Sequence, residues 1–152
     1  MLSTCLANLR EKSPLVHSIT NFVTVNDCAN LLLACGARPI MASDPQEAAE
    51  ITAADALNIN IGTLNHLLVP AMLDAGRTAN RLGIPVLLDP VGVGASSLRR
   101  QTVAQLLKEL KLTAIRANAS EIRAIARLEQ AQPSGPSAGV DALPDDLVTK
   151  EQ

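Results

Sequence analysis

The segment Asp89-Pro-Val-Gly-Val-Gly94 places a carboxylate directly after an apolar run and two glycines before a predicted helix. Glycines let the backbone approach a ligand closely, and a helix start favours anions, so this segment could receive phosphate groups. It is not a dinucleotide-binding fingerprint, because the third glycine is absent and Glu109, about 20 residues on, falls inside a predicted helix. The alternative is a tight strand-to-helix turn in which Asp89 caps backbone amides.

A second candidate segment places Arg116, Asn118 and Glu121 where a short apolar run meets another predicted helix. Asn118 followed three residues later by Glu121 is the spacing of a capping box, and spacing alone favours that structural role. The same amide and carboxylate, beside an arginine, could also hold hydrated Mg²⁺ and phosphate oxygens. Both interpretations stay open at this point.

Three further candidates follow other predicted strands, and each has an ordinary structural explanation. Asn21 ends a polar run and could simply cap the next helix. Met41 follows a short apolar run, where a core position is the more common role. Gly62 lies in a segment that fits a strand-to-helix turn. None of these signals is specific alone.

The elements that would position these residues alternate between strands and helices. Apolar runs predict strands at residues 15–19, 38–41, 56–61, 85–88 and 113–115. Helical periodicity predicts helices at 24–35, 46–52, about 69–82, 97–110 and from 118 onward. This alternation predicts an α/β fold, with a parallel sheet flanked by helices on both faces. Ligands of such sheets bind at the carboxyl ends of the strands, where all the candidates lie.

The composition of the 152 residues narrows the classes of partner. Phe22 is the lone aromatic and the net charge is −2, which argues against nucleic acid. No apolar run approaches the about 20 residues of a membrane span, and no secretory signal is evident, so we expect a cytoplasmic protein. Two distant histidines and three cysteines without CxxC spacing argue against a His/Cys metal site. Charged residues make up only 18%, which favours subunit contacts.

Taken together, the segments resemble those of the hydroxyethylthiazole kinase family, which belongs to the ribokinase-like superfamily. The resemblance rests on PLVHSITNFVTVNDCANLLLACGARPIM, LNINIGTL, GIPVLLDPVGVGA and AIRANASEI, in this order. It covers essentially residues 8–128, and DPVGVGA and IRANASE are its most specific parts. The fold it implies is a ribokinase-like parallel sheet, with residues 1–128 as the N-terminal part of a single domain. Residues 129–152, rich in proline, are expected to form a linker or tail.

The resemblance implies a reaction, a cofactor and an assembly. The reaction is ATP-dependent phosphorylation of the primary alcohol of 4-methyl-5-(2-hydroxyethyl)thiazole, in thiamine biosynthesis or salvage. ATP would be the co-substrate, Mg²⁺ the cofactor, and a homotrimer would form the thiazole site between subunits. The implied thiazole-binding residues are Met41, Asn21 and Gly62, and the implied ATP-binding residues are Arg116 and Asn118. The implied catalytic residues are Asp89 and Glu121, which would also hold Mg²⁺, through water.

The chain also departs from the family pattern. Ala117 stands where the family has glycine. The family's later Val-Thr-Gly and Gly-Thr-Gly-Cys segments, which serve the nucleotide and the reacting hydroxyl, do not occur in these 152 residues. The fold is therefore expected to be incomplete at the C-terminus, with an exposed sheet edge, self-association and negligible turnover. The alternatives are a non-catalytic, thiazole-binding or oligomerising remnant of the family, and an unrelated small α/β nucleotide-binding module.

Overall fold

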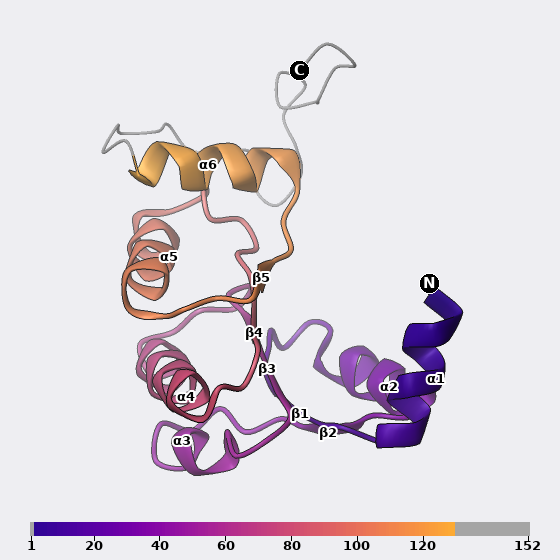
Figure 1. The fold of residues 1–152 in the computed structure, drawn as a ribbon. Coiled ribbons are helices and arrows are strands. Elements are labelled where there is room, and N and C mark those ends of the chain that lie inside the picture. The colour runs from indigo at the N-terminus through magenta and orange to yellow at the C-terminus, as the bar shows by residue number, and fades with distance from the viewer. Residues whose placement is uncertain (1, 130–152) are drawn as a thin grey trace, which may run out of the picture.

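A five-stranded parallel sheet runs through the middle of the protein, as the sequence predicts (Figure 1). The computed structural model describes residues 2–129. The strands are β1 (Leu15–Ile19), β2 (Arg38–Ile40), β3 (Ala56–Asn60), β4 (Val86–Asp89) and β5 (Ala114–Ile115). Their order across the sheet is β2-β1-β3-β4-β5, and all four neighbouring pairs are parallel. Every predicted strand is present, with bounds within two residues of those expected.

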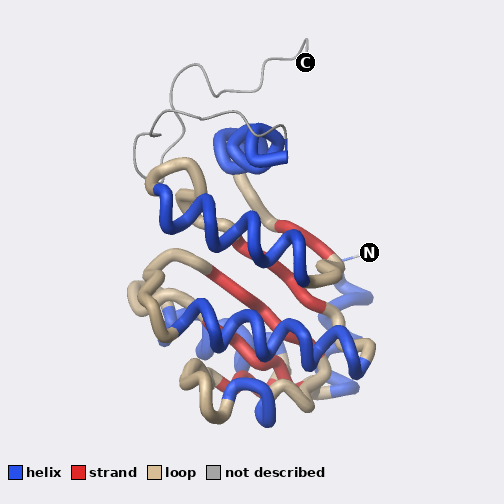
Figure 2. The backbone as a smooth tube through the Cα atoms, turned by 90° about the vertical axis from the view of Figure 1, so that its left-hand side faces the viewer, coloured by secondary structure: helices blue, strands red, loops and turns tan. Residues whose placement is uncertain are grey.

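Helices lie on both faces of this sheet (Figures 1 and 2). They are α1 (Leu2–Lys12), α2 (Val25–Cys35), α3 (Ala48–Ile51), α4 (Leu68–Leu82), α5 (Ser97–Glu109) and α6 (Ala119–Glu129). In Figure 1, α3, α4 and α5 stand on one side of the sheet, whereas α1 and α2 stand on the other, beside β1 and β2. The sequence pattern does not predict α1. No helix in residues 2–129 has both the length and the apolar content needed to cross a membrane.

The core fills the space between the sheet and the α4–α5 side. Alternate residues of β3 and β4 point into it, including Leu57, Ile59 and Leu88, all at most 1% exposed. Two apolar side chains whose helical spacing predicts a core position, Leu82 and Ile122, are exposed instead. Leu82, 58% exposed, ends α4 just before the left-handed cap at Gly83. Ile122 is 48% exposed because α6 buries the adjacent stripe of Glu121, Ala124 and Ile125.

The opposite face of the sheet is covered only in part by the described residues. The continuous apolar run at 85–88 predicts a strand covered on both faces, but Leu87 of β4 is 36% exposed on the face away from α4 and α5. Helix α2 has no buried residue, and the side chains whose spacing predicts an inward face are only partly buried, namely Val25, Cys28, Ala29 and Leu32. Of the predicted tail, 129–152, Glu129 ends α6 and the remainder lies outside the described residues.

Candidate functional site

The parallel sheet gathers the candidate residues along one edge. Asn21 follows β1, Met41 follows β2, Gly62 follows β3, Asp89 ends β4 and Arg116 follows β5. Since all the strands point the same way, their carboxyl ends share this edge, as the sequence predicts. The strand order places Met41 at one end and Arg116 at the other.

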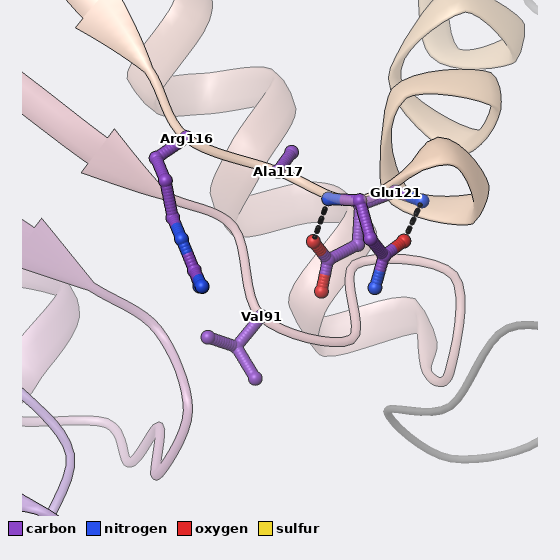
Figure 3. Close-up of a pocket in the computed structure, with 5 residues that line it drawn as sticks. Val91, Arg116, Ala117 and Glu121 are labelled. Atoms are coloured by element: carbon purple, nitrogen blue, oxygen red, sulfur yellow. Dashed lines mark hydrogen bonds between the residues drawn. The ribbon is translucent and has the colours of Figure 1, made fainter.

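A pocket of about 280 Å³ opens at the Arg116 end of this edge (Figure 3). It is lined by Val91, Arg116, Ala117, Asn118 and Glu121. Figure 3 shows Arg116 and Val91 on one side of it, and Glu121 on the other. The two candidate segments, which are about 25 residues apart in the sequence, therefore form one site.

The backbone conformation at position 117 does not require glycine. Among the described residues, the one non-glycine residue with a positive φ is Ser13. The methyl group of Ala117 therefore sits on ordinary backbone, where any residue can stand. The substitution changes the lining of the pocket, and it does not strain the chain.

Asn118 and Glu121 form the capping box that their spacing predicts. The Asn118 Oδ1 accepts from the Glu121 N–H at 2.9 Å, and the Glu121 Oε2 accepts from the Asn118 N–H at 2.9 Å. The Glu121 Oε1 also accepts from the N–H of Gly92, at 2.9 Å. Gly92 has φ +62, a conformation that favours glycine. Glu121, 6% exposed, thus fixes both its own helix and the loop that follows β4.

Asp89 is placed quite differently, because one of its oxygens has no hydrogen-bond partner among the described residues. Its Oδ2 accepts from the Asn60 Nδ2 at 3.0 Å and lies 3.3 Å from Arg116 Nη1. Its Oδ1 is buried and accepts no hydrogen bond in the described part of the chain. Burial raises the pKa of Asp89 above its usual range, against the opposing charge of Arg116. A carboxylate with an unsatisfied oxygen can accept a hydrogen bond from a ligand or from the water of a hydrated cation.

Asn60 joins the two halves of the site, and sequence reasoning did not single it out. The Asn21 Oδ1 accepts from the N–H of Thr24 at 3.1 Å, so its Nδ2 is the atom that donates to Asn60 Oδ1, at 3.1 Å. The same Asn60 oxygen accepts from the N–H of Gly62 at 2.8 Å, which leaves Asn60 Nδ2 to donate to Asp89. The one available signal was a polar residue ending an apolar strand.

Gly62 is held closely between these side chains. A Cβ built on Gly62 would lie 2.8 Å from the Asn21 Cβ and 3.0 Å from Asn60 Oδ1. A side chain there would displace the amide network, so the position demands glycine for space. Gly62 and Asn21 are both half-buried at the carboxyl edge of the sheet.

Met41 stands apart from the amide network. It is half-buried, and the residue after it, Ala42, accepts a hydrogen bond from His17 Nε2 at 2.7 Å. The His17 Nδ1 lies 2.9 Å from Thr52 Oγ1. Burial lowers the pKa of His17, which is fully enclosed, and the bond from its Nε2 to Ala42 holds this segment in place.

Comparison with known proteins finds relatives along nearly the whole chain. The family model described as the hydroxyethylthiazole kinase family matches residues 6–149. A hydroxyethylthiazole kinase of Clostridium acetobutylicum is 58% identical over 149 residues, covering 97% of this chain and 53% of that protein. One of Alkaliphilus metalliredigens is 53% identical over 142 residues, covering 93% of this chain and 50% of that protein.

A solved structure shows the same similarity in three dimensions. The hydroxyethylthiazole kinase of Pyrococcus horikoshii OT3 superposes with a TM-score of 0.80 at 43% identity, covering 84% of this chain and 50% of that one. The chain thus spans about half the length of the relatives it matches. Its parallel sheet with flanking helices is the corresponding part of their ribokinase-like fold, which confirms the predicted fold class. The match over nearly the whole chain shows that it belongs to the hydroxyethylthiazole kinase family.

Proposed function

We propose that this chain forms the thiazole-binding side, and part of the phosphate side, of a cytoplasmic hydroxyethylthiazole kinase. The reaction would transfer the terminal phosphate of ATP to the primary alcohol of 4-methyl-5-(2-hydroxyethyl)thiazole, in thiamine biosynthesis or salvage. The observation that carries the proposal is Asp89, whose buried Oδ1 has no hydrogen-bond partner among residues 2–129 and lies at the edge that binds ligands in such sheets. The family membership supplies the substrate.

The thiazole side would lie over the ends of β1, β2 and β3. Asn21 and Gly62 are in contact through Asn60, whose Oδ1 accepts from both, and Gly62 packs directly against the Asn21 side chain. Met41 would bring an apolar, polarisable group to the ring from the edge strand β2. These three residues combine polar and apolar contacts, as a small heteroaromatic alcohol requires.

The phosphate side would lie over the ends of β4 and β5. The Arg116 side chain is 77% exposed and reaches Asp89 across the mouth of the site, so it is free to turn toward an anion. Asn118 opens α6, whose N-terminus favours phosphate. The guanidinium would neutralise charge on the transferring group, which is the main requirement of phosphoryl transfer.

The residues present fit a hydrated Mg²⁺, which in such enzymes neutralises the charge of the transferring phosphate. The described residues contain no group of three or more His, Cys, Asp and Glu that could enclose a metal. Magnesium, however, keeps several waters and takes one or two carboxylates plus phosphate oxygens. Asp89 would offer Oδ1, and Glu121 the remaining lone pairs of its two capped oxygens, both through water.

The apolar surface around α2 supports assembly with further copies of the chain. Its large hydrophobic side chains are more than half exposed, namely Phe22, Val23, Leu31 and Leu33. This surface begins one residue after Asn21, so a second subunit packed on it would border the thiazole side. We therefore propose the homotrimer, with the substrate site at the subunit interface.

Two measurements on the purified chain test the proposal. Calorimetric titration with the thiazole alcohol should give saturable binding that Met41→Ala weakens. Leu82→Ala serves as the control, because it truncates an exposed apolar side chain at the C-terminal end of α4, which does not belong to the site. Absence of binding by the parent chain would contradict the thiazole-site assignment.

Phosphate transfer from ATP to the same alcohol is measured in parallel. Turnover at an ordinary kinase rate of about 1–100 s⁻¹ would show that the described half suffices for chemistry. Binding without turnover would favour the alternative, a thiazole-binding or oligomerising remnant. The proposed domain organisation, with residues 1–128 as one folded part and 129–152 as a linker or tail, predicts that a 1–128 variant keeps the binding.

A further inference from the structure

Arg99 makes three hydrogen bonds to backbone carbonyls on two different sides of the site. Its Nη1 donates to the carbonyls of Ile61 at 2.8 Å and Val91 at 2.5 Å. Its Nη2 donates to the carbonyl of Gly62 at 2.7 Å. Ile61 and Gly62 belong to the thiazole side, whereas Val91 lines the phosphate pocket.

These bonds begin where the sheet ends. The last backbone hydrogen bond between the two segments joins the N–H of Ile61 to the carbonyl of Asp89, at 3.2 Å. Beyond it the chains separate, and a carbonyl in a turn at this depth needs a donor from elsewhere. Arg99 supplies that donor to both segments at once, so it continues the connection between them past the end of the ladder.

The start of α5 aims the guanidinium toward this edge. Ser96 caps the helix in an extended conformation, and its Oγ accepts from the N–H of Arg99 at 3.2 Å. A side chain in the first turn of a helix leans toward its N-terminus, which here faces the carboxyl ends of the strands. The planar guanidinium offers five N–H groups in a fixed fork, and therefore reaches separate acceptors without bending.

We propose that Arg99 is a positioning residue that sets the spacing between the thiazole-side backbone at 61–62 and the phosphate-side loop at 90–94. The inference rests on the proposed function, because that function assigns the two segments to the two reactants. Phosphoryl transfer requires the alcohol and the phosphate within about 3–3.5 Å of each other. A shared donor fixes this separation from beneath the site, without touching either reactant.

The neighbouring arginine provides a matched control. Arg100 donates to the carbonyl of Gly94 at 2.8 Å, in the same loop, and as far as the structure describes the chain it makes no hydrogen bond to residues 61–62. Arg100→Gln therefore removes an arginine-to-carbonyl bond on the phosphate side alone. Arg99→Gln removes the connection between the two sides, and Arg99→Lys keeps the charge but not the fork.

Amide hydrogen exchange in the ligand-free chain measures the connection directly. The amides of Gly62 and Gly92 report on the two sides, since each donates to a side-chain oxygen. With Ile59 in the core as the internal standard for global unfolding, we expect Arg99→Gln to speed exchange at both glycines by about 10- to 100-fold. Arg100→Gln should leave Gly62 unchanged, and Arg99→Lys should not restore joint protection.

Two results would overturn the inference. One is unchanged exchange at Gly62 in Arg99→Gln, and the other is an equal change at Gly62 in Arg100→Gln. If Arg99→Lys keeps both glycine amides as protected from exchange as in the parent, the effect belongs to the positive charge and not to the forked guanidinium. That result contradicts the inference as well.

A second arm adds the thiazole alcohol and measures the spread of its effect. In the parent, saturating alcohol should slow exchange at Gly62 and, through Arg99, at Gly92. In Arg99→Gln it should slow Gly62 alone, an outcome that a purely structural role would not produce. If the parent does not bind the alcohol, the proposed function fails for this chain, while the ligand-free comparison still decides the role of Arg99.

Discussion

Replacing Asn60 with alanine should separate the two halves of the site and destabilise the fold. The substitution removes three hydrogen bonds, to Asp89 at 3.0 Å, from Gly62 at 2.8 Å and from Asn21 at 3.1 Å. Asn60 is 8% exposed, so water replaces these bonds poorly. After the substitution, Arg116 is the described residue that still contacts Asp89 Oδ2.

The magnitude follows from the types of bond that are lost. A hydrogen bond to a charged group contributes about 1.5–3 kcal/mol, and a neutral one about 0.5–1.5 kcal/mol. The retained contact of Asp89 with the exposed Arg116 offsets part of the first. We therefore expect Asn60→Ala to lower the free energy of unfolding by about 2–4 kcal/mol.

Urea unfolding at one fixed protein concentration measures this loss, with Asn58→Ala as the control. Asn58 lies on the same strand, and its Nδ2 donates a hydrogen bond to Ser18 Oγ at 2.9 Å. Its removal should lower the unfolding free energy by about 0.5–1.5 kcal/mol. If Asn60→Ala costs no more than Asn58→Ala, the hydrogen-bond network does not connect the two halves energetically.

Asn60→Asp adds a test of the electrostatics. It replaces the donor to Asp89 with a second carboxylate, so each group raises the pKa of the other. A carboxyl whose pKa is raised by folding keeps that contribution to stability at low pH and loses it as pH rises. We expect Asn60→Asp to lose stability relative to Asn60→Ala as pH increases from acid to neutral. Parallel pH profiles for the two variants would refute the proximity of the two side chains.

Three further predictions concern the carboxylates and the α2 surface. Burial raises the pKa of Asp89 above its reference value of 3.8, so its ionisation opposes folding as pH rises. Asp89→Asn should therefore be more stable than the parent at neutral pH. In urea unfolding, this difference in stability should vanish below pH 3.8. Glu121→Gln places an NH₂ group against the N–H of either Gly92 or Asn118, and should lower the unfolding free energy by about 1–3 kcal/mol, whereas Glu11→Gln, on exposed α1, should not. Leu31→Lys, at a side chain 66% exposed, should leave the fold intact and shift sedimentation toward the monomer.

The order of the elements could be predicted because its cause lies in local sequence. Runs such as 56–61 and 85–88 are too apolar for the surface and too short for helices, so they become strands of a covered sheet. Once the strands are parallel, the positions of Asn21, Asp89 and Arg116 at one edge follow from topology alone. The capping box is also local, since Asn118 and Glu121 form it within one turn.

What the sequence could not predict depends on pairing between distant segments. Asn60 becomes the centre of the site only because β3 lies between β1 and β4, beside both Asn21 and Asp89. Arg99 binds backbone carbonyls, which every residue has, so its acceptors leave no pattern in the sequence. The exposure of Leu82 likewise depends on where α4 ends relative to the sheet.

Asp89 differs from its neighbours in a way that structure alone does not explain. Glu121 gives both oxygens to backbone N–H groups, and Arg99 donates to three carbonyls, so each stabilises a turn. Within the described part of the chain, Asp89 leaves Oδ1 buried without a partner, which costs about 1–3 kcal/mol, and an asparagine there could keep the bond from Asn60. A carboxylate kept where an amide would be more stable is typical of a functional position, because such sites are where local stability is given up. The same reasoning makes Asp89→Asn the sharpest single substitution, since it should gain stability while weakening the proposed binding of hydrated Mg²⁺.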